Sequence, residues 1–158
     1  MPTSIYIETT IPSAYYNTRT EPEFVAQQNW TREWWDEQRH RYTVVSSLAV
    51  IEELQEGNHP LQAEKLAFTA SVPLLQASER VKDVVEAYVR HHLMPSDPGG
   101  DALHLALASV HRCDILLTWN CRHLANYNKV GHIRRVNEQL GLHVPAILTP
   151  FELLEPKD

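Results

Sequence analysis

The sequence predicts an α/β protein, a three-layer α/β/α sandwich with a central, mostly parallel sheet, and three observations support this class. Short apolar runs rich in β-branched residues alternate with longer amphipathic stretches, as in chains of βαβ units. Several of these runs are almost entirely apolar, which is typical of strands covered on both faces. The 158 residues contain no linker, repeat or low-complexity tract. We therefore expect a single domain over residues 1–158 with one sizeable core.

Four strands are expected from alternation or from short apolar runs. Residues 4–8 alternate between apolar and polar side chains, and residues 42–46 are rich in β-branched residues. Residues 114–119 and 146–149 are further short runs of mainly apolar residues. We expect residues 72–75 to form a short extended link.

The helices are expected where apolar residues recur at helical spacing and where capping residues stand at the ends. Pro22 suits the first turn of one helix, and Pro12 suits a helical turn soon after the first strand. Gly57 and Gly141 suit the positions that follow helix ends. Residues 97–100 are a strong turn signal. The expected helices cover residues 22–39, 47–56, 61–70, 78–89, 101–111 and 129–140.

The composition is that of an ordinary globular protein, with 43% apolar and 22% charged residues. Two cysteines, Cys113 and Cys121, are too few for a disulfide framework and indicate free thiols in a reducing compartment. The first residues lack the basic and apolar parts of a signal peptide. No apolar run approaches the ~20 residues that cross a bilayer. We expect a cytoplasmic protein with no membrane partner.

The formal net charge of −6 argues against strong non-specific binding to nucleic acid, which depends on lysine and arginine at the phosphates. The charge is uneven, however. Between residues 101 and 150 there are five basic and three acidic residues, and five of the nine histidines lie there. A basic rim beside an acidic pocket would still allow a nucleic-acid substrate.

Three acidic residues and one amide stand at strand ends and on helices that follow, where an α/β fold gathers polar groups. Glu8 ends the first strand, Glu53 lies on the helix after the second, and Asp101 opens an apolar helix. Asn120 follows the strand of residues 114–119. Carboxylate and amide oxygens are donors that hard divalent ions such as Mg²⁺ prefer. The four residues are therefore candidates for one metal site.

The segments around these four positions resemble the motifs of the PIN domain family, the metal-dependent ribonuclease fold of VapC-type toxins, over nearly the whole chain. Residues 5–10, Ile-Tyr-Ile-Glu-Thr-Thr, resemble the family's first strand with its acid. Residues 47–57 resemble the second motif, a helix that carries the second acid. Residues 101–106, Asp-Ala-Leu-His-Leu-Ala, resemble the third motif, and residues 116–120 resemble the fourth. The four motifs occur in the family's order.

The resemblance implies an endoribonuclease that uses Mg²⁺ or Mn²⁺ to hydrolyse phosphodiesters of an RNA substrate, leaving a 5′-phosphate and a 3′-hydroxyl. Glu8, Glu53 and Asp101 would hold the metal directly or through water, and Asn120 would complete or support the site. The ions would activate the attacking water and shield the charge of the phosphate. The resemblance also implies a homodimer and a cognate antitoxin, so that the chain would be the toxin of a type II toxin–antitoxin pair.

Two positions depart from the family pattern, which usually has aspartate at both. Glu8 adds one methylene of reach, so the metal would lie slightly displaced. Asn120 removes one negative charge but keeps a carbonyl oxygen that can coordinate an ion or hold a water. Fewer carboxylates weaken the binding of a second cation more than that of the first. We therefore expect one firm metal site and a weaker second one.

Five further residues are candidates for substrate binding. Thr9 and Thr118 stand next to proposed metal ligands and can bond either those ligands or a substrate phosphate. Arg122, His123 and Asn126 follow the fourth motif at the same edge of the predicted sheet. The alternative for these last three residues is an ordinary solvated loop.

Several of these positions also have structural interpretations. Glu8 has the alternative of a solvated carboxylate at a strand end, and Asn120 that of a turn or cap residue before residues 121–123. Asp101 can cap the first turn of its helix, and His104 is expected to be a packed histidine that supports the site. Glu53 is preferred to Glu52 because the family pattern pairs its acid with a following leucine. Three tryptophans at near-helical spacing favour a core or subunit contact over stacking on RNA bases. They are Trp30, Trp34 and Trp35.

One other function remains open, and two further ones are disfavoured. A catalytically weak PIN-fold module that binds RNA or a protein partner would agree with Asn120 and with the acidic net charge. An aspartate-nucleophile phosphohydrolase normally needs a second aspartate two residues after the first, whereas Glu8 is followed by two threonines. A zinc enzyme is disfavoured because the histidines and cysteines show no paired ligand spacing.

Overall fold

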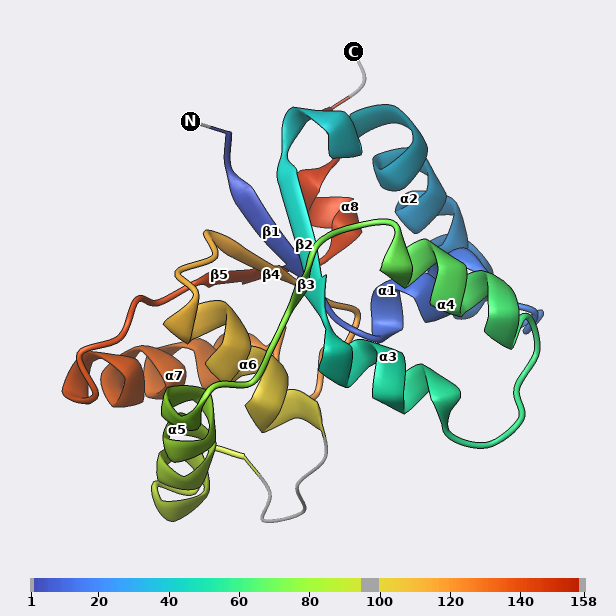
Figure 1. The fold of residues 1–158 in the computed structure, drawn as a ribbon. Coiled ribbons are helices and arrows are strands. Elements are labelled where there is room, and N and C mark those ends of the chain that lie inside the picture. The colour runs from blue at the N-terminus through green and yellow to red at the C-terminus, as the bar shows by residue number, and fades with distance from the viewer. Residues whose placement is uncertain (1, 95–99, 157–158) are drawn as a thin grey trace.

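The computed structural model describes residues 2–94 and 100–156, which fold around a five-stranded sheet in which neighbouring strands are parallel (Figure 1). The strand order is β3-β2-β1-β4-β5. Ile5 lies opposite Val44 on one side of β1 and opposite Ile115 on the other. The predicted class, an α/β fold with a central parallel sheet, is confirmed. The strands are β1 (Ser4–Ile7), β2 (Thr43–Ser47), β3 (Leu74–Leu75), β4 (Ile115–Leu117) and β5 (Ala146–Leu148).

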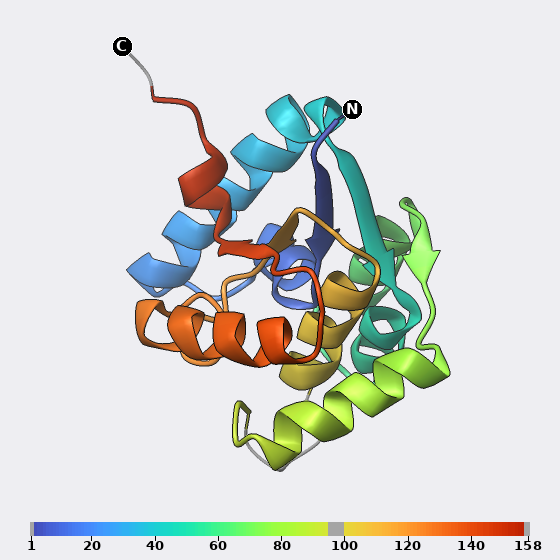
Figure 2. The same ribbon diagram turned by 90° about the vertical axis from the view of Figure 1, so that its left-hand side faces the viewer.

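Helices cover both faces of the sheet, with α5, α6 and α7 on one side and α1, α2 and α4 on the other (Figure 1). Figure 2 shows α8 beside α2, and the two helices are in contact. None of the helices in the described ranges is long and apolar enough to cross a membrane. The helices are α1 (Thr10–Tyr15), α2 (Pro22–Gln38), α3 (Leu48–Gln55), α4 (Gln62–Ala70), α5 (Glu79–Arg90), α6 (Gly100–Val110), α7 (Tyr127–Gln139) and α8 (Pro150–Leu153), with a 3-10 turn η1 (Arg39–Arg41).

Alternate residues of the two central strands supply the two layers of the core. Ile5 and Ile7 of β1 belong to one hydrophobic cluster and Tyr6 to the other, and all three side chains are fully buried. In β4, Leu117 belongs to the cluster of Ile5, and Leu116 belongs to the cluster of Tyr6. Successive side chains of a strand point to opposite faces, so the sheet holds both helical layers.

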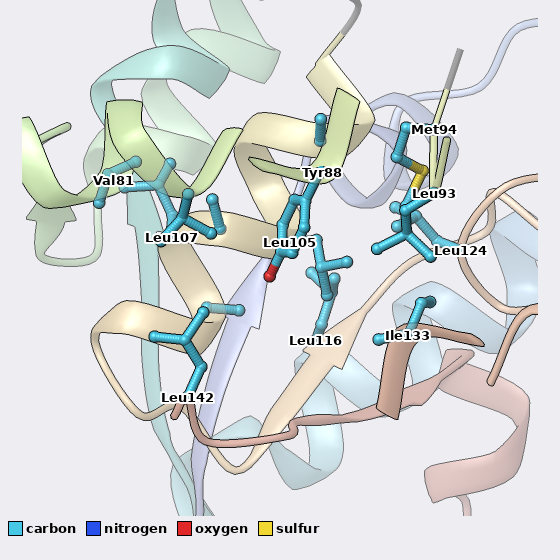
Figure 3. Packing of buried hydrophobic residues seen from close by; sticks show 14 of the residues in the cluster. Val81, Tyr88, Leu93, Met94, Leu105, Leu107, Leu116, Leu124, Ile133 and Leu142 are labelled. Atoms are coloured by element: carbon cyan, nitrogen blue, oxygen red, sulfur yellow. The ribbon is translucent and has the colours of Figure 1, made fainter. Parts of the chain in front are cut away.

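The larger cluster packs α5, α6 and α7 against the sheet. Leu105 and Leu107 of α6, Tyr88 of α5 and Ile133 of α7 surround Leu116 of β4 (Figure 3). All five side chains are at most 1% exposed. This packing fixes α6, whose first turn carries Asp101, against the strand that leads to Asn120.

The second cluster confirms the predicted packing role of two of the tryptophans. Trp34 and Trp35 of α2 are buried, and the Trp35 ring lies 4.0 Å from the ring of Phe68 on α4. Trp30 is half-buried and stacks on Trp119, with 6.0 Å between the ring centroids. The tryptophans of α2 therefore bind this helix to the sheet and to α4.

Side-chain caps and glycines define several helix ends. Ser47 ends β2 and caps α3, because its Oγ accepts a hydrogen bond from the backbone N–H of Val50 at 3.3 Å. Ser78 caps α5 in the same way. Gly57 and Gly141, both with φ of +68°, follow α3 and α7 as predicted. Strand β2 therefore passes directly into the helix that carries Glu53.

Two elements differ from the prediction. The expected link at residues 72–75 contains β3, because Leu74 and Leu75 pair in parallel with the end of β2. Helix α7 begins two residues early, at Tyr127, because the Asn126 side chain accepts a hydrogen bond from the N–H of Asn128 at 2.9 Å. Most of the predicted turn at residues 97–100 lies outside the described residues.

Helix α8 was not expected. Pro150 stands at its start, and Thr149 and Glu152 form a capping box there. A helix of four residues is too short to show helical periodicity, so only this capping signal marks it in the sequence. Cys113 and Cys121 are both free, as expected.

Candidate functional site

The candidate site lies at the edge of the sheet where the parallel strands end. Glu8 directly follows β1, and Thr118 directly follows β4. Helix α3, which carries Glu53, begins at the end of β2 and contacts α6, whose first turn contains Asp101. Figure 1 shows α3 and the start of α6 together beyond the ends of β1 and β2. Parallel strands point their carboxyl ends the same way, so residues far apart in the sequence meet here.

His104 is the buried centre of this region. Its ring is only 1% exposed, and Nε2 lies 2.7 Å from Oε1 of Glu53. Its other ring nitrogen, Nδ1, lies 2.6 Å from the hydroxyl of Tyr6, which in turn lies 2.7 Å from Oγ of Ser47. Because a carboxylate can only accept, Nε2 carries the proton toward Glu53. The side chains of β1, β2, α3 and α6 are thereby joined in one hydrogen-bond chain.

Three carboxylates act on this histidine. Burial of the ring opposes its protonation, but the hydrogen bond and charge of Glu53 and the charges of Glu8 and Asp101 outweigh burial. The pKa of His104 therefore lies above its ordinary value. The structure thus bonds one predicted acid, Glu53, to a buried imidazole whose charge is also stabilised by the other two, Glu8 and Asp101.

Glu53 is held by two side chains. Its Oε1 faces His104, and its Oε2 accepts a hydrogen bond from Oγ1 of Thr9 at 2.5 Å. Partial burial would raise the pKa of this carboxyl, but His104 and Thr9 favour the charged form and the pKa lies below its ordinary value. Glu52, the neighbouring acid, is exposed. Thr9 therefore contacts a proposed metal ligand, as one of its two predicted roles required.

Glu8 is almost completely buried, with 3% of its surface exposed. Its Oε1 accepts hydrogen bonds from the backbone N–H of Thr10, at 3.0 Å, and from the Thr10 hydroxyl. Burial raises the pKa of this carboxyl, and the charge of His104 and hydrogen bonds from Thr10 and Thr118 oppose the rise. Oγ1 of Thr10 also accepts a hydrogen bond from the N–H of Trp119 at 2.8 Å. Thr10 thus links the ends of β1 and β4, a role that sequence reasoning did not assign to it.

Asn120 presents its amide nitrogen to Asp101. Nδ2 donates a hydrogen bond to Oδ1 of Asp101 at 2.8 Å. The amide oxygen accepts from the backbone N–H groups of Arg122 and His123, at 3.2 and 3.0 Å. Backbone N–H groups can only donate, so this orientation of the amide follows from its partners. The amide oxygen thus bonds the following turn, which is the structural alternative for Asn120, and its contact with an ion or a water stays a prediction.

The other predicted substrate residues lie on this loop. Arg122 is exposed and His123 is half-buried. Asn126 caps α7 with its oxygen, and its Nδ2 donates to the backbone oxygen of Arg122 at 3.1 Å. Asn126 therefore has a structural task, and its contact with substrate stays a prediction, as do those of Arg122 and His123.

Gly100 is a site residue that sequence reasoning missed. A Cβ atom built on Gly100 would overlap Oε1 of Glu53 and would lie 2.8 Å from Nε2 of His104. Only glycine lets the start of α6 approach the carboxylate this closely. The sequence predicts Gly100 as part of a turn. Only the tertiary structure shows that a side chain at this position would also collide with Glu53.

The side chains at this site are of the right chemical type for a divalent ion, but their arrangement differs from that of a coordination site. Carboxylate oxygens are the right donors for Mg²⁺ or Mn²⁺. Within residues 2–94 and 100–156, however, no group of three or more histidine, cysteine, aspartate or glutamate side chains is placed to hold one ion. Glu53 and Asp101 instead bond Thr9, His104 and Asn120. An ion held by this set would therefore share these oxygens with the internal hydrogen bonds or replace some of the bonds.

The architecture is a PIN-like α/β fold. It is similar to a chain in the crystal structure of VapBC2 from Rickettsia felis bound to a DNA fragment from their promoter, with a TM-score of 0.54. The similarity covers 93% of this protein and 98% of that chain, at 14% sequence identity. No family model matches the sequence, and no curated protein matches it. The similarity therefore concerns the fold.

Proposed function

We propose that this protein is a PIN-type ribonuclease that hydrolyses RNA phosphodiesters with Mg²⁺ or Mn²⁺. The observation that carries the proposal is that three acids at the carboxyl end of the sheet act on His104: Glu53 through a hydrogen bond, and Glu8 and Asp101 through their charges. One acid would be enough for a structural ion pair with His104, whereas three acids from three separate segments act on it. A cluster of this charge is strongly anionic whenever the acids are ionised, and a cation would relieve the repulsion.

Each residue of the site would have a separate role. Glu8, Glu53 and Asp101 would hold the ion, which when bound lowers the pKa of a water and polarises the phosphoryl group. His104 would position Glu53, since its other ring nitrogen is anchored on Tyr6.

The surrounding polar groups would act on the ligands and the substrate. Thr9 and Thr118 would orient the carboxylates. Arg122 and His123 would contact the substrate phosphate from the loop after β4, and Asn120 would support Asp101. Cleavage would leave a 5′-phosphate and a 3′-hydroxyl.

The partner proteins are part of the same proposal. The fold neighbour comes from a VapBC2 assembly bound to promoter DNA. By analogy, we propose that this chain is the toxin of a toxin–antitoxin pair, a homodimer that binds a cognate antitoxin. An adjacent gene for a small DNA-binding protein, whose product co-purifies with this chain, would support the pairing. A chain that purifies alone and stays monomeric when that neighbour is co-expressed would contradict it.

Cleavage of mixed structured RNAs by the purified protein tests the nuclease, with Mg²⁺, Mn²⁺ or chelator. We expect the wild type to cut with either ion and not with chelator, and Asp101→Ala to be inactive but folded. Asp83→Ala, which removes an exposed aspartate of α5, is the matched control and should cut like the wild type. Equal cutting by Asp101→Ala would remove Asp101 from the site.

The same assay distinguishes the two adjacent glutamates of α3. Glu53→Gln keeps the size of the side chain but removes its charge, and we expect it to lose metal-dependent cleavage. Glu52→Gln changes an exposed neighbour in the same helix and should have no effect. The opposite result would assign the ligand to Glu52.

A second candidate function is a catalytically weak module that binds RNA or a protein partner. The contact between the Asn120 amide nitrogen and Asp101 favours it, because an amide here gives Asp101 a hydrogen-bond donor where a further carboxylate would give an ion another ligand. Calorimetry with Mg²⁺ and Mn²⁺ separates the two functions. Absence of both metal binding and cleavage, in a folded protein that still binds RNA, would favour the binding module.

A further inference from the structure

A separate pocket with a mainly apolar lining lies beside the carboxylates, between α1, α2 and α4. It has a volume of about 420 Å³, within the range of small-ligand sites. Thr10 and Trp119 form part of its wall. These are the two residues that connect the pocket to Glu8, since Thr10 bonds both the Glu8 carboxylate and the N–H of Trp119. The pocket is thus next to the proposed site but separate from its acids.

The pocket holds a buried cation that lacks an acidic partner. Lys65 of α4 lines it and is only 8% exposed. Nζ of Lys65 lies 3.2 Å from Nδ1 of His59, and no carboxylate in residues 2–94 and 100–156 lies within ion-pair distance of it. Nε2 of His59 is 2.8 Å from the backbone oxygen of Leu54 and must donate to it, so Nδ1 of neutral His59 is an acceptor.

This arrangement has an energetic cost that an anion would relieve. Burial lowers the pKa of Lys65, because the charged form has lost part of its hydration. Buried charges in proteins are normally paired with an opposite charge or a metal. Here the paired group is a neutral imidazole. A ligand with a negative charge inside the pocket would supply the missing partner.

Aromatic rings and a second cation complete the pocket. Arg19 lies over the ring of Phe24 with its guanidinium carbon 3.9 Å from the ring centroid, and both residues line the pocket. Nε of Arg19 also donates to Oε2 of Glu21 at 3.2 Å, in an exposed ion pair at the rim. The Trp119 ring is held in place, because it stacks on Trp30 and its Nε1 donates to Oγ1 of Thr31 at 2.8 Å. No acidic side chain from the described ranges lines the pocket. Cations beside fixed aromatic faces are the groups that bind single-stranded nucleic acid.

We propose that this pocket binds one nucleotide of single-stranded RNA next to the phosphodiester that is cleaved, with the phosphate of that nucleotide at Lys65. Arg19 meets the same phosphate or its neighbour, and the base lies against the aromatic wall. The substrate class rests on the proposed ribonuclease function. The pocket then selects unpaired RNA, because a base in a duplex cannot enter it.

The test is the binding of a labelled, mixed-sequence, single-stranded oligoribonucleotide, followed by fluorescence anisotropy in chelator so that no metal-dependent cleavage occurs. Lys65→Met should weaken binding roughly tenfold or more, as for loss of a charge-assisted hydrogen bond. It should also lower the slope of log affinity against log salt by about 0.7, which is the value for one lost phosphate contact. Lys65→Arg should keep the salt slope of the wild type.

Two further variants keep the test decisive. Arg19→Gln changes a side chain that is 62% exposed and threatens the fold little, and it should reduce the salt slope by a similar step. Lys82→Met removes an exposed lysine of α5 outside the pocket and should leave the slope unchanged. If Lys65→Met does not fold, Arg19→Gln decides alone. Wild-type affinity and salt slope in folded Lys65→Met or in Arg19→Gln would overturn the proposal.

A short oligoglutamate peptide is the competing ligand. Binding of this peptide but not of the oligonucleotide, with loss in Lys65→Met, would assign the pocket to an acidic protein segment and overturn the proposal. The cleavage assay with Asp101→Ala is independent of all these measurements. If oligonucleotide binding depends on Lys65 but the protein never cleaves RNA, the proposal for the pocket is supported and the proposed nuclease activity is rejected.

Discussion

Nε2 of His104 lies 2.7 Å from Oε1 of Glu53, which makes a buried residue of α6 the anchor for an acid of α3. The two residues are 51 positions apart in the sequence. Tyr6 fixes the other side of the imidazole, at 2.6 Å. The orientation of the Glu53 carboxylate is therefore decided by groups on the central strand and on two helices together.

Removal of the Tyr6 hydroxyl should destabilise the protein. We expect Tyr6→Phe to lower the free energy of unfolding by about 2 kcal/mol, because it leaves a buried ring nitrogen of His104 without its partner. Urea denaturation measures the change. Tyr42→Phe, in a half-buried tyrosine outside this network, is the control and should stay within about 0.5 kcal/mol. Equal effects of the two variants would contradict the role of the network.

The pair of His104 and Glu53 should make stability depend on pH. The pKa of His104 is raised above its ordinary 6.5, so its contribution is complete below pH 6.5 and is lost as the pH rises through the folded-state pKa. The pKa of Glu53 is lowered below its ordinary 4.5, so its contribution is complete above pH 4.5 and is lost on acidification through the folded-state pKa. The pair therefore stabilises the fold most between about pH 4.5 and 6.5.

His104→Gln is the variant that checks this dependence. In chelator, the difference in unfolding free energy between wild type and His104→Gln should be largest near pH 5.5 and should shrink above neutral pH. Denaturant titrations at several pH values measure it. A difference that is constant from pH 5 to 8 would mean that His104 does not titrate with the pair.

A methyl group at position 100 should disturb the site. Gly100→Ala places a Cβ against the carboxylate of Glu53 and the ring of His104, and we expect a loss of about 2 kcal/mol in stability. Gly131→Ala is the matched control in α7, where the nearest atom to a new Cβ is the distal Nη1 of Arg135 at 3.8 Å. Gly131→Ala should stabilise the protein by up to about 1 kcal/mol. A neutral Gly100→Ala would mean that α6 does not approach Glu53 as closely as described.

Asn120→Asp tests whether this position faces a metal. The change replaces the amide nitrogen that donates to Asp101 with a second carboxylate oxygen, so the melting temperature in chelator should fall. A divalent ion bound between the two acids should restore it in proportion to its concentration. Differential scanning fluorimetry with and without Mg²⁺ measures both effects, with Asn128→Asp as an exposed control. If the melting temperature of Asn120→Asp did not change with Mg²⁺, residue 120 would lie away from the ion.

The fold was predictable because its signals are local. Apolar runs mark β1, β2, β4 and β5. Serine residues mark the starts of α3 and α5, and glycine residues follow the ends of α3 and α7. The edge strand β3 escaped prediction, because two residues carry no alternation and their pairing with β2 is a long-range contact. Helix α8 escaped because four residues cannot show a helical period.

The candidate site was predictable only as a set of residue types. The sequence supplied Glu8, Glu53 and Asp101, since each stands at a strand end or on a helix of a βαβ pattern. It also placed His104 beside them as a packed, supporting residue but did not indicate its bond to Glu53, because a histidine on an apolar helix has the same local pattern whether it packs or bonds an acid. It left open whether Asn120 serves an ion or the following turn, because the orientation of its amide depends on the backbone of the loop that follows it.

The sequence by itself therefore determined the layered α/β class, most helix ends and the identity of the acids at the sheet edge. Hydrophobic period and capping act over a few residues, so they can be recognised in a single chain. Only the tertiary structure decided the strand order, the imidazole that anchors Glu53, the glycine that lets α6 approach and the buried lysine in the neighbouring pocket. These features depend on hydrogen bonds and burial between segments many residues apart, which are created when the sheet assembles.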